Sequence, residues 1–446
     1  MKQPYRKLTV FSWSMYDFAN QPFTTLIVTF IYGTFFTKVI AENEIVGTLL
    51  WSRGITITAL IVAFLSPIMG AIADKGGYRK LYLIFWTWVS IAGSLLLWFP
   101  IEGQVIFALT AFIIGNVGFE MGSVFCNAFL PDIAPKEKIG RVSGYGWSLG
   151  YVGGLIALAL GLLLFINPEI SIFNLDKSTH EHIRGTNIMV AIWFAVFSIP
   201  TFLFVNEDHR SGKKKTNLIA DSIKQIRETF RNVRQYRELT RFLIARLIYN
   251  DGLITVFAFG GIYAAGTFDF SFQEIMIFAI VLNVAAGLGA FLMGFLDDFI
   301  GGKQTIQISN YGLILACIIA VVAPNRDLFN IALPIIGDTI ISGKTLFWLS
   351  GILIGIFSGP NQASSRSLMA RFVPQGKENE FFGFFAFSGK ATAFIGPFFL
   401  GYFTLLFNSQ RYGIAVVLFL LVIGTILLRS VDEEAGMAAS NNPDIT

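Results

Sequence analysis

The sequence is poor in charged residues and nearly free of cysteine. Asp, Glu, Lys and Arg make up 14% of its 446 residues, whereas a soluble domain carries about 25%. Its two cysteines, Cys126 and Cys317, lie inside apolar runs in opposite halves of the chain, which argues against a disulfide framework and against a thiolate metal site. The composition therefore points away from a soluble protein and from a disulfide-stabilised one.

Catalytic and nucleotide-binding motifs are also missing. The three histidines, His180, His182 and His209, fall in predicted loops; the first two could hold a metal ion, but a solvated loop pair is the favoured interpretation. The stretch GKQ at 302–304 lacks the Ser or Thr and the upstream glycine spacing of a phosphate-binding loop. We therefore expect neither an enzyme nor a cofactor, and any work must come from a gradient rather than from ATP.

Apolar residues, in contrast, make up 54% of the chain. Many runs exceed about 18 residues, which is long enough to span a bilayer. The basic start, MKQPYRKLTV, precedes a long run that carries Asp17 and Pro22, so we expect a retained first helix rather than a cleaved signal peptide. The pattern predicts an all-α membrane protein with twelve transmembrane helices, at 11–37, 47–73, 81–99, 105–130, 144–166, 187–205, 241–266, 275–298, 306–323, 345–369, 381–407 and 411–429.

The basic residues set the expected orientation of these spans. Of the 33 Lys and Arg residues, 24 fall in the terminal and connecting segments on one side of the predicted membrane, and 6 fall on the other. By the positive-inside rule, both termini are predicted to be cytoplasmic. Short loops and few cysteines fit a bacterial inner membrane. The net charge of +4 reflects these basic loops and calls for no nucleic-acid partner.

A polar turn occurs twice and divides the chain into equal halves. GAIADKGGYRK at 70–80 matches GFLDDFIGGKQ at 294–304 with an offset of 224. Residues 127–154 also align without gaps on 366–393, with an offset of 239, so the extra residues are expected near 324–344, where a short interfacial helix is possible. The duplication predicts two pseudo-symmetric six-helix bundles, at 1–205 and 241–430, followed by a cytoplasmic tail at 431–446.

Residues 206–240 are expected to link the bundles through an amphipathic helix. Its apolar positions recur at helical spacing, and basic residues line an adjacent face. We expect this helix to lie on the inner membrane surface, and a solvated linker helix is the alternative. The apolar positions are Ile219, Ile223, Ile226, Phe230 and Val233, and the basic ones are Lys224, Arg227, Arg231 and Arg234.

Several stretches resemble a known family of transporters. The GxxxDxxGxR turn after the second and eighth predicted spans is similar to that of the major facilitator superfamily. WSMYDFAN, NAFLPDIAP, RVSGYGWSLGYVGG and the long stretch GPNQASSRSLMARFVPQGKENEFFGFFAFSGK resemble the Unknown Major Facilitator family, which is related to the fungal vacuolar amino-acid effluxer of autophagy. The resemblance covers nearly the whole chain. It implies the major facilitator fold, rocker-switch alternating access, and amino acids as a candidate substrate class.

Charged residues within the spans are the candidate binding residues. Placing a charged side chain in hydrocarbon costs roughly 2.5–3.5 kcal/mol of insertion free energy, so each such residue is expected to have a functional or structural role. Asp17 lies on the first span, one helical turn before Asn20, and is predicted to face a central cavity as a substrate-amine or proton site. The alternative is a buried structural carboxylate paired with Arg246 or Lys390.

The seventh span, which matches the first by symmetry, carries Arg246, Asn250 and Asp251. Arg246 suits a substrate carboxylate, and Asp251 suits an ammonium group or a proton. The alternative is an ion pair, within the helix or between bundles, that only holds the fold.

Glu120 and Lys390 complete the predicted binding set. A lone carboxylate in the middle of the fourth span suits a proton carrier, and a neutral hydrogen-bonded Glu is its alternative. Lys390, on the eleventh span, is expected to bind a substrate carboxylate or to pair with an acidic residue of the other half. Proton coupling is therefore assigned to Asp17, Glu120 and Asp251.

The duplicated turn supplies the predicted gate. Asp74 and Arg79 in the first copy, and Asp298 and Lys303 in the second, are expected to pair across helix ends and to exchange partners as the bundles rock. The alternative is that these residues only set the topology.

We therefore expect a monomeric secondary active transporter for a small polar or zwitterionic solute, with amino acids as the candidate solutes and protons as the candidate coupling ion. The expected partners are the small-molecule substrate, protons and the lipid bilayer. The alternatives are an exporter of sugar-like or amphipathic molecules, and a non-transporting receptor or scaffold with the same fold.

Overall fold

The computed structural model describes residues 6–167, 173–207, 236–323 and 342–440, together with a few positions between 222 and 229. Ten of its helical segments are long and apolar enough to cross a membrane. Helices α4 and α13 supply the other two predicted spans; α4 begins with Arg79 and Lys80, and α13 carries a polar second half. The twelve-helix prediction is confirmed.

The first half contains six spans. The first of them, Lys7–Ile40, is made of α1 (Lys7–Pro22), η1 (Phe23–Phe30), α2 (Tyr32–Phe35) and η2 (Phe36–Ile40). The others are α3 (Glu44–Gly76), α4 (Arg79–Leu96), α5 (Val105–Asn127), α7 (Ile139–Gly161, continued by η4, Leu162–Ile166) and α8 (Glu181–Phe204). Two short elements, α6 (Leu130–Ile133) and η3 (Lys136–Lys138), connect α5 to α7.

The second half repeats this pattern. Its spans are α10 (Arg237–Phe268), α11 (Phe272–Ile300), α12 (Gly302–Val322), α13 (Gly343–Phe372), the pair α14 (Glu378–Lys390) and α15 (Ile395–Phe407), and α16 (Gln410–Arg429). A short helix, α17 (Glu433–Ser440), follows the last span.

Two spans are not continuous α-helices. In the first, α1 ends at Pro22 and the next eight residues form a π-helix, because proline removes a backbone donor from the α-helical ladder. The eleventh, predicted at 381–407, is one candidate span from Glu378 to Phe407 but is not one continuous helix. The structure breaks it at 391–394 into α14 and α15.

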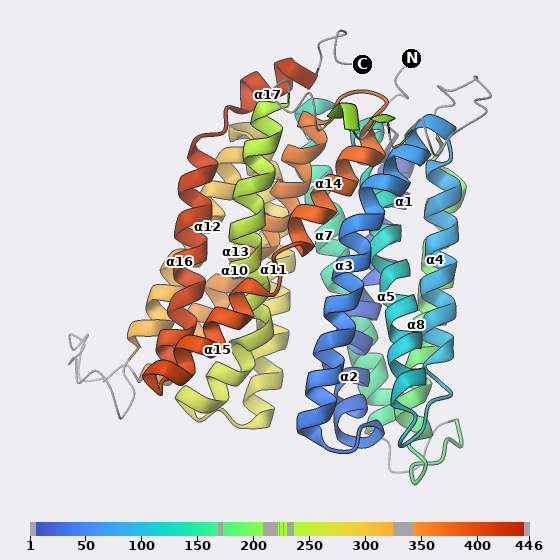
Figure 1. Cartoon of the computed structure of the whole chain (residues 1–446), viewed down its shortest axis with the longest axis vertical. Coiled ribbons are helices and arrows are strands. Elements are labelled where there is room, and N and C mark those ends of the chain that lie inside the picture. Colours follow the sequence, from blue (N-terminus) through green and yellow to red (C-terminus); the bar gives the residue numbers. More distant parts are fainter. Residues whose placement is uncertain are drawn as a thin grey trace.

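The halves meet along two pairs of helices. Figure 1 shows the first half, in blue and cyan, beside the second, in yellow to red, with α14 and α7 between them. Helix α14 packs along α3, and α11 packs along α7. Small residues allow this approach: a Cβ at Gly144 of α7 would lie 2.5 Å from the Ala290 carbonyl of α11, and one at Gly70 of α3 would overlap the Asn379 carbonyl of α14.

One end of the molecule, which we term the gate end, holds the turns that contact the opposite half. The α3–α4, α11–α12 and α13–α14 turns lie there together with α17, at the top of Figure 1. The linker is described only in part: Lys224 and Arg227 are helical and exposed, as expected for its basic face. Its predicted apolar positions, with Arg231 and Arg234, and the insertion at 324–341 lie outside the described residues.

Candidate functional site

Glu120 of α5 and Lys390, the last residue of α14, form an ion pair between the halves. The Lys390 Nζ lies 2.6 Å from the Glu120 Oε1. The side chains of Lys390 and Glu120 are 29% and 19% exposed, whereas Arg366, the cation of the next pair toward the gate end, is only 4% exposed. Of the two roles that the sequence allowed for Lys390, the structure has the pair with an acidic residue. Part of the surface of both side chains is therefore not covered by protein.

Asp17 of α1 pairs with Arg366 of α13, nearer the gate end. The Arg366 Nη1 donates to the Asp17 Oδ2 at 2.8 Å and to the Asn127 Oδ1 at 3.0 Å. Its Nε donates to the Ser143 Oγ at 2.9 Å, and its Nη2 donates to the Ser143 carbonyl at 2.7 Å. The guanidinium also lies 4.7 Å from the ring of Trp13. Arg366 thereby joins three helices of the first half to α13.

Arg366 was not among the residues predicted for the site, and Asp17 pairs with neither of its expected partners. The sequence repeat pointed to Arg366, because it aligns Asn127 with Arg366. In the structure these two equivalent residues of the two halves are hydrogen-bonded to each other. Asn20, one turn after Asp17, is buried and donates to the Ser123 Oγ of α5 at 3.4 Å.

Arg246, Asn250 and Asp251 of α10 are buried, with 6%, 4% and 2% of their surface exposed. Their contacts go to the broken eleventh span and, for Asn250, also to Gln362 of α13, rather than to the first half. The Arg246 Nη1 donates to the Phe385 carbonyl and to the Ser388 Oγ, each at 2.7 Å. Among the described residues neither Arg246 nor Asp251 forms the ion pair that the sequence left open.

Asp74 and Asp298 cap helices of the opposite half. The Asp74 carboxylate accepts from the backbone N–H groups of Asn379 and Glu380, at 3.0 and 2.8 Å, at the start of α14. The Asp298 carboxylate accepts from those of Gly140 and Arg141, at 2.8 and 3.3 Å, at the start of α7. The recipients differ by 239, which is the offset of the sequence repeat. Each carboxylate thus stabilises the positive end of a helix dipole in the other bundle.

The basic residues of the two turns behave differently. The Arg79 guanidinium bridges Asp132 of its own half, at 2.6 Å, and Glu378 of the other, at 3.0 Å. Lys303 stays within its own half, where its Nζ donates to the Arg429 carbonyl at 3.1 Å. Asp298 instead forms an ion pair with Arg141 of the first half, whose Nε lies 2.5 Å from the Asp298 Oδ2.

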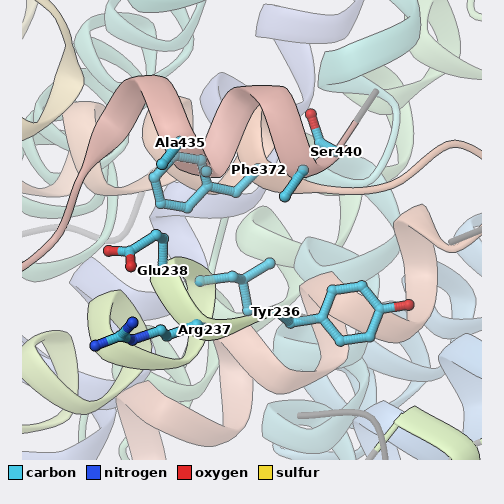
Figure 2. Close-up of a pocket in the computed structure, with 9 residues that line it drawn as sticks. Tyr236, Arg237, Glu238, Phe372, Ala435 and Ser440 are labelled. Carbon is cyan, nitrogen blue, oxygen red and sulfur yellow. The ribbon is translucent and has the colours of Figure 1, made fainter. Parts of the chain in front are cut away.

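The structure therefore distributes the predicted site residues rather than gathering them in one cluster. Four ion pairs and the two caps join the halves, and the α10 residues lie at the break between α14 and α15. A described pocket of about 180 Å³ lies elsewhere, at the gate end between α10, α13 and α17, lined by residues that include Tyr236, Phe372 and Ser440 (Figure 2). Among the described residues, no three His, Cys, Asp or Glu side chains gather as metal ligands would.

Comparison with known proteins gives the chain a family. The model of the family described as "Vacuole effluxer Atg22 like" matches residues 49–441. The uncharacterized MFS-type transporter YxiO of Bacillus subtilis is 27% identical over 433 residues, which cover 96% of each chain. Autophagy-related protein 22 of Kluyveromyces lactis is 22% identical over 409 residues, which cover 86% of this chain and 79% of the yeast protein.

Solved structures of major facilitator transporters share the fold. The proton:xylose symporter XylE, bound to 6-bromo-6-deoxy-D-glucose, superposes with a TM-score of 0.72 at 13% identity and covers 97% of each chain. FucP in the outward conformation gives a TM-score of 0.71 at 12% identity, over 95% of this chain and 98% of FucP. At these identities the likeness concerns the fold alone, and it confirms two six-helix bundles of the major facilitator type.

Proposed function

The chain belongs to the Atg22-like effluxer family of major facilitator transporters, and on this premise we propose that it is a secondary active transporter of small zwitterionic solutes, with amino acids as the first candidates. The two halves, 1–205 and 241–430, would rock about the Glu120–Lys390 pair, linked by 206–240. We further propose that it lies in a bacterial inner membrane with the gate end in the cytoplasm.

The Glu120–Lys390 pair carries this proposal. A partly exposed carboxylate and ammonium 2.6 Å apart, one from each half, are matched in charge to the ammonium and carboxylate of an amino acid. A bound zwitterion would take over both interactions, so neither side chain is left as an unpaired charge in a low-dielectric site. Because the two groups belong to different halves, a solute that binds both favours one separation of the halves over another.

Proton coupling is proposed at Glu120, with Asp17 as a second candidate. Protonation of Glu120 removes the charge that holds Lys390, so a proton and a solute ammonium would compete for the same carboxylate. Asp17 stands in the same relation to Arg366, at 2.8 Å. Release of either pair loosens the contact between the halves.

The gate is proposed to consist of the caps made by Asp74 and Asp298 and of the pairs made by Arg79 and Arg141. In the present conformation these contacts join the two halves at the gate end. They would break when the halves rock to expose the solute on that side. Lys303, which contacts only its own half among the described residues, is proposed to support the α11–α12 turn rather than to cross the gate.

A ligand screen followed by transport tests the proposal. Purified protein is heated with each proteinogenic amino acid and, separately, with sugars and nucleosides, because a bound ligand raises the melting temperature by mass action. We expect amino acids to give the shifts. Counterflow of a radiolabelled amino-acid mixture into proteoliposomes then reports transport in either direction.

Glu120→Gln and Lys390→Gln should each reduce counterflow at least tenfold. The matched control is Glu274→Gln, which breaks the Lys344–Glu274 pair; this pair is also 2.6 Å long but lies within the second half. The control should leave counterflow within about twofold, because an exposed ion pair contributes only about 0–1 kcal/mol to stability. Shifts confined to sugars or nucleosides, or full counterflow in Glu120→Gln, would overturn the proposal. Uptake that does not change with an imposed pH gradient would rule out proton coupling.

A further inference from the structure

We infer that Arg246, Asn250 and Asp251 are positioning residues: they clamp the two ends of the broken eleventh span and so hold Lys390 against Glu120, without touching the solute. This inference rests on the proposed function for the role of Lys390. It reassigns three residues that the sequence placed in the binding site.

A break within a span leaves backbone groups that need partners, because lipid offers none. Here α14 ends at Lys390 and α15 begins at Ile395. Helix α10 supplies the partners: the Asn250 Nδ2 donates to the Gly389 carbonyl at 3.2 Å, and the Asp251 Oδ2 accepts from the Gly396 N–H at 3.0 Å. Thr392, within the break, donates from its Oγ1 to the Leu247 carbonyl of α10 at 3.2 Å.

The charges of the clamp match the dipoles of the two helix ends. Asp251 faces the first turn of α15, where the positive end of the dipole lies, and Arg246 contacts the last two turns of α14, near the negative end. The Arg246 guanidinium also lies 3.6 Å from the centre of the Phe385 ring. These partners offset part of the cost of burying the two groups, although the Arg246 Nε and the Asp251 Oδ1 have no hydrogen-bond partner among the described residues.

The clamp is connected to Lys390 on one side and to α13 on the other. Lys390 directly follows Gly389, whose carbonyl is bound by Asn250, and directly precedes the break. On the other side, the Asn250 Oδ1 accepts from the Gln362 Nε2 of α13 at 3.1 Å. A change at Lys390 therefore reaches α15 and α13 through α10. The low exposure of the three clamp residues argues against direct contact with a solute.

Substitutions of Asp251 distinguish this positioning role from a proton-binding or ammonium-binding role. Asp251→Asn keeps an oxygen that can cap α15 but loses the charge, whereas Asp251→Ala loses the cap. With the radiolabelled amino-acid mixture, we expect Asn to retain the wild-type KM and pH profile within about twofold. Ala should raise the KM at least tenfold with a smaller effect on the maximal rate, because Lys390 is then poorly positioned.

Thr392→Val serves as a milder second variant, since it removes one hydrogen bond with little change in shape; it should raise the KM a few-fold. An inactive but well-folded Asp251→Asn would overturn the inference, as would a fully active Asp251→Ala.

Hydrogen exchange at residues 391–396 gives a readout that needs no solute. Wild type and Asp251→Asn should protect the Gly396 amide equally, and Asp251→Ala should exchange it at least tenfold faster. If the wild-type protein moves no amino acid but this pattern holds, the proposed function fails while the clamp stands. Equal exchange in all three proteins would refute the clamp whatever the transport result.

Discussion

Arg366→Lys should shift the protein away from the conformation that is closed at the gate end. Every hydrogen bond of the Arg366 side chain described above ends on the first half, so these bonds form only while the halves are together. Lysine keeps the positive charge and can still reach Asp17. It cannot also bond the Ser143 hydroxyl and carbonyl, which Arg366 holds at 2.9 and 2.7 Å.

The loss can be estimated from those two bonds. A hydrogen bond to a charged group contributes about 1.5–3 kcal/mol, so losing two weakens the closed conformation by at least about 3 kcal/mol. Since about 1.4 kcal/mol is a factor of ten, the ratio of closed to open molecules should fall at least about a hundredfold.

Distances between spin labels at Glu137 and Gln375, two exposed positions at the gate end of opposite halves, measure this ratio. The native Cys126 and Cys317 are buried and should label little. A second label pair, at Tyr78 and Glu137 within the first half, should not change.

Arg184→Lys is the matched control for this experiment. Arg184 is also buried and lies 5.2 Å from the ring of Trp98, but its hydrogen bonds go to the Trp98 and Thr179 carbonyls of its own half. It should lower thermal stability without lengthening the distance between the halves. A distance distribution in Arg366→Lys that matches wild type would refute the reasoning.

Three further predictions concern the gate end. Gly70→Ala should push α3 from α14 and lengthen the same label distance, whereas Gly401→Ala, where nothing lies within 4 Å of the added methyl group, should not. Ending the chain after Ser430 should lower the melting temperature by a few degrees, because it removes the Glu433 carboxylate, which accepts from the Gly302 and Lys303 amides at 3.0 and 2.9 Å. Glu433→Gln should reproduce most of this loss. An unchanged melting temperature in the truncated protein would contradict the prediction. Lys303→Gln should leave counterflow within about twofold, whereas Arg79→Gln should reduce it at least tenfold; equal effects would contradict the different contacts of the two residues.

The sequence predicted best what periodicity and duplication control. Long apolar runs gave the spans, because length and apolar character suffice to place a helix across a bilayer. The repeat offsets of 224 and 239 connected Asp74 with Asp298 and residues 379–380 with 140–141, and the structure joins these groups in two equivalent caps.

What the sequence did not reveal depends on contacts between residues far apart in the chain. The break after Lys390 has one signal in the sequence, because Pro397 lacks the N–H that a continuous helix would bond to the Ala393 carbonyl. Its backbone partners come from α10, about 140 residues earlier, and a single sequence does not display them. Likewise, Arg366 lies near the end of the predicted span 345–369, where a basic residue is typical of a connecting segment. Its burial follows from the tight packing of α13 against α7, which a single sequence does not display.

A cryo-EM structure with the amino acid selected by the thermal screen tests the central claim most directly. The account predicts that the Glu120 carboxylate contacts the ammonium of the solute, that Lys390 contacts its carboxylate, and that the 2.6 Å bond between the two side chains is broken. A solute bound elsewhere, with the Glu120–Lys390 pair intact, would contradict it.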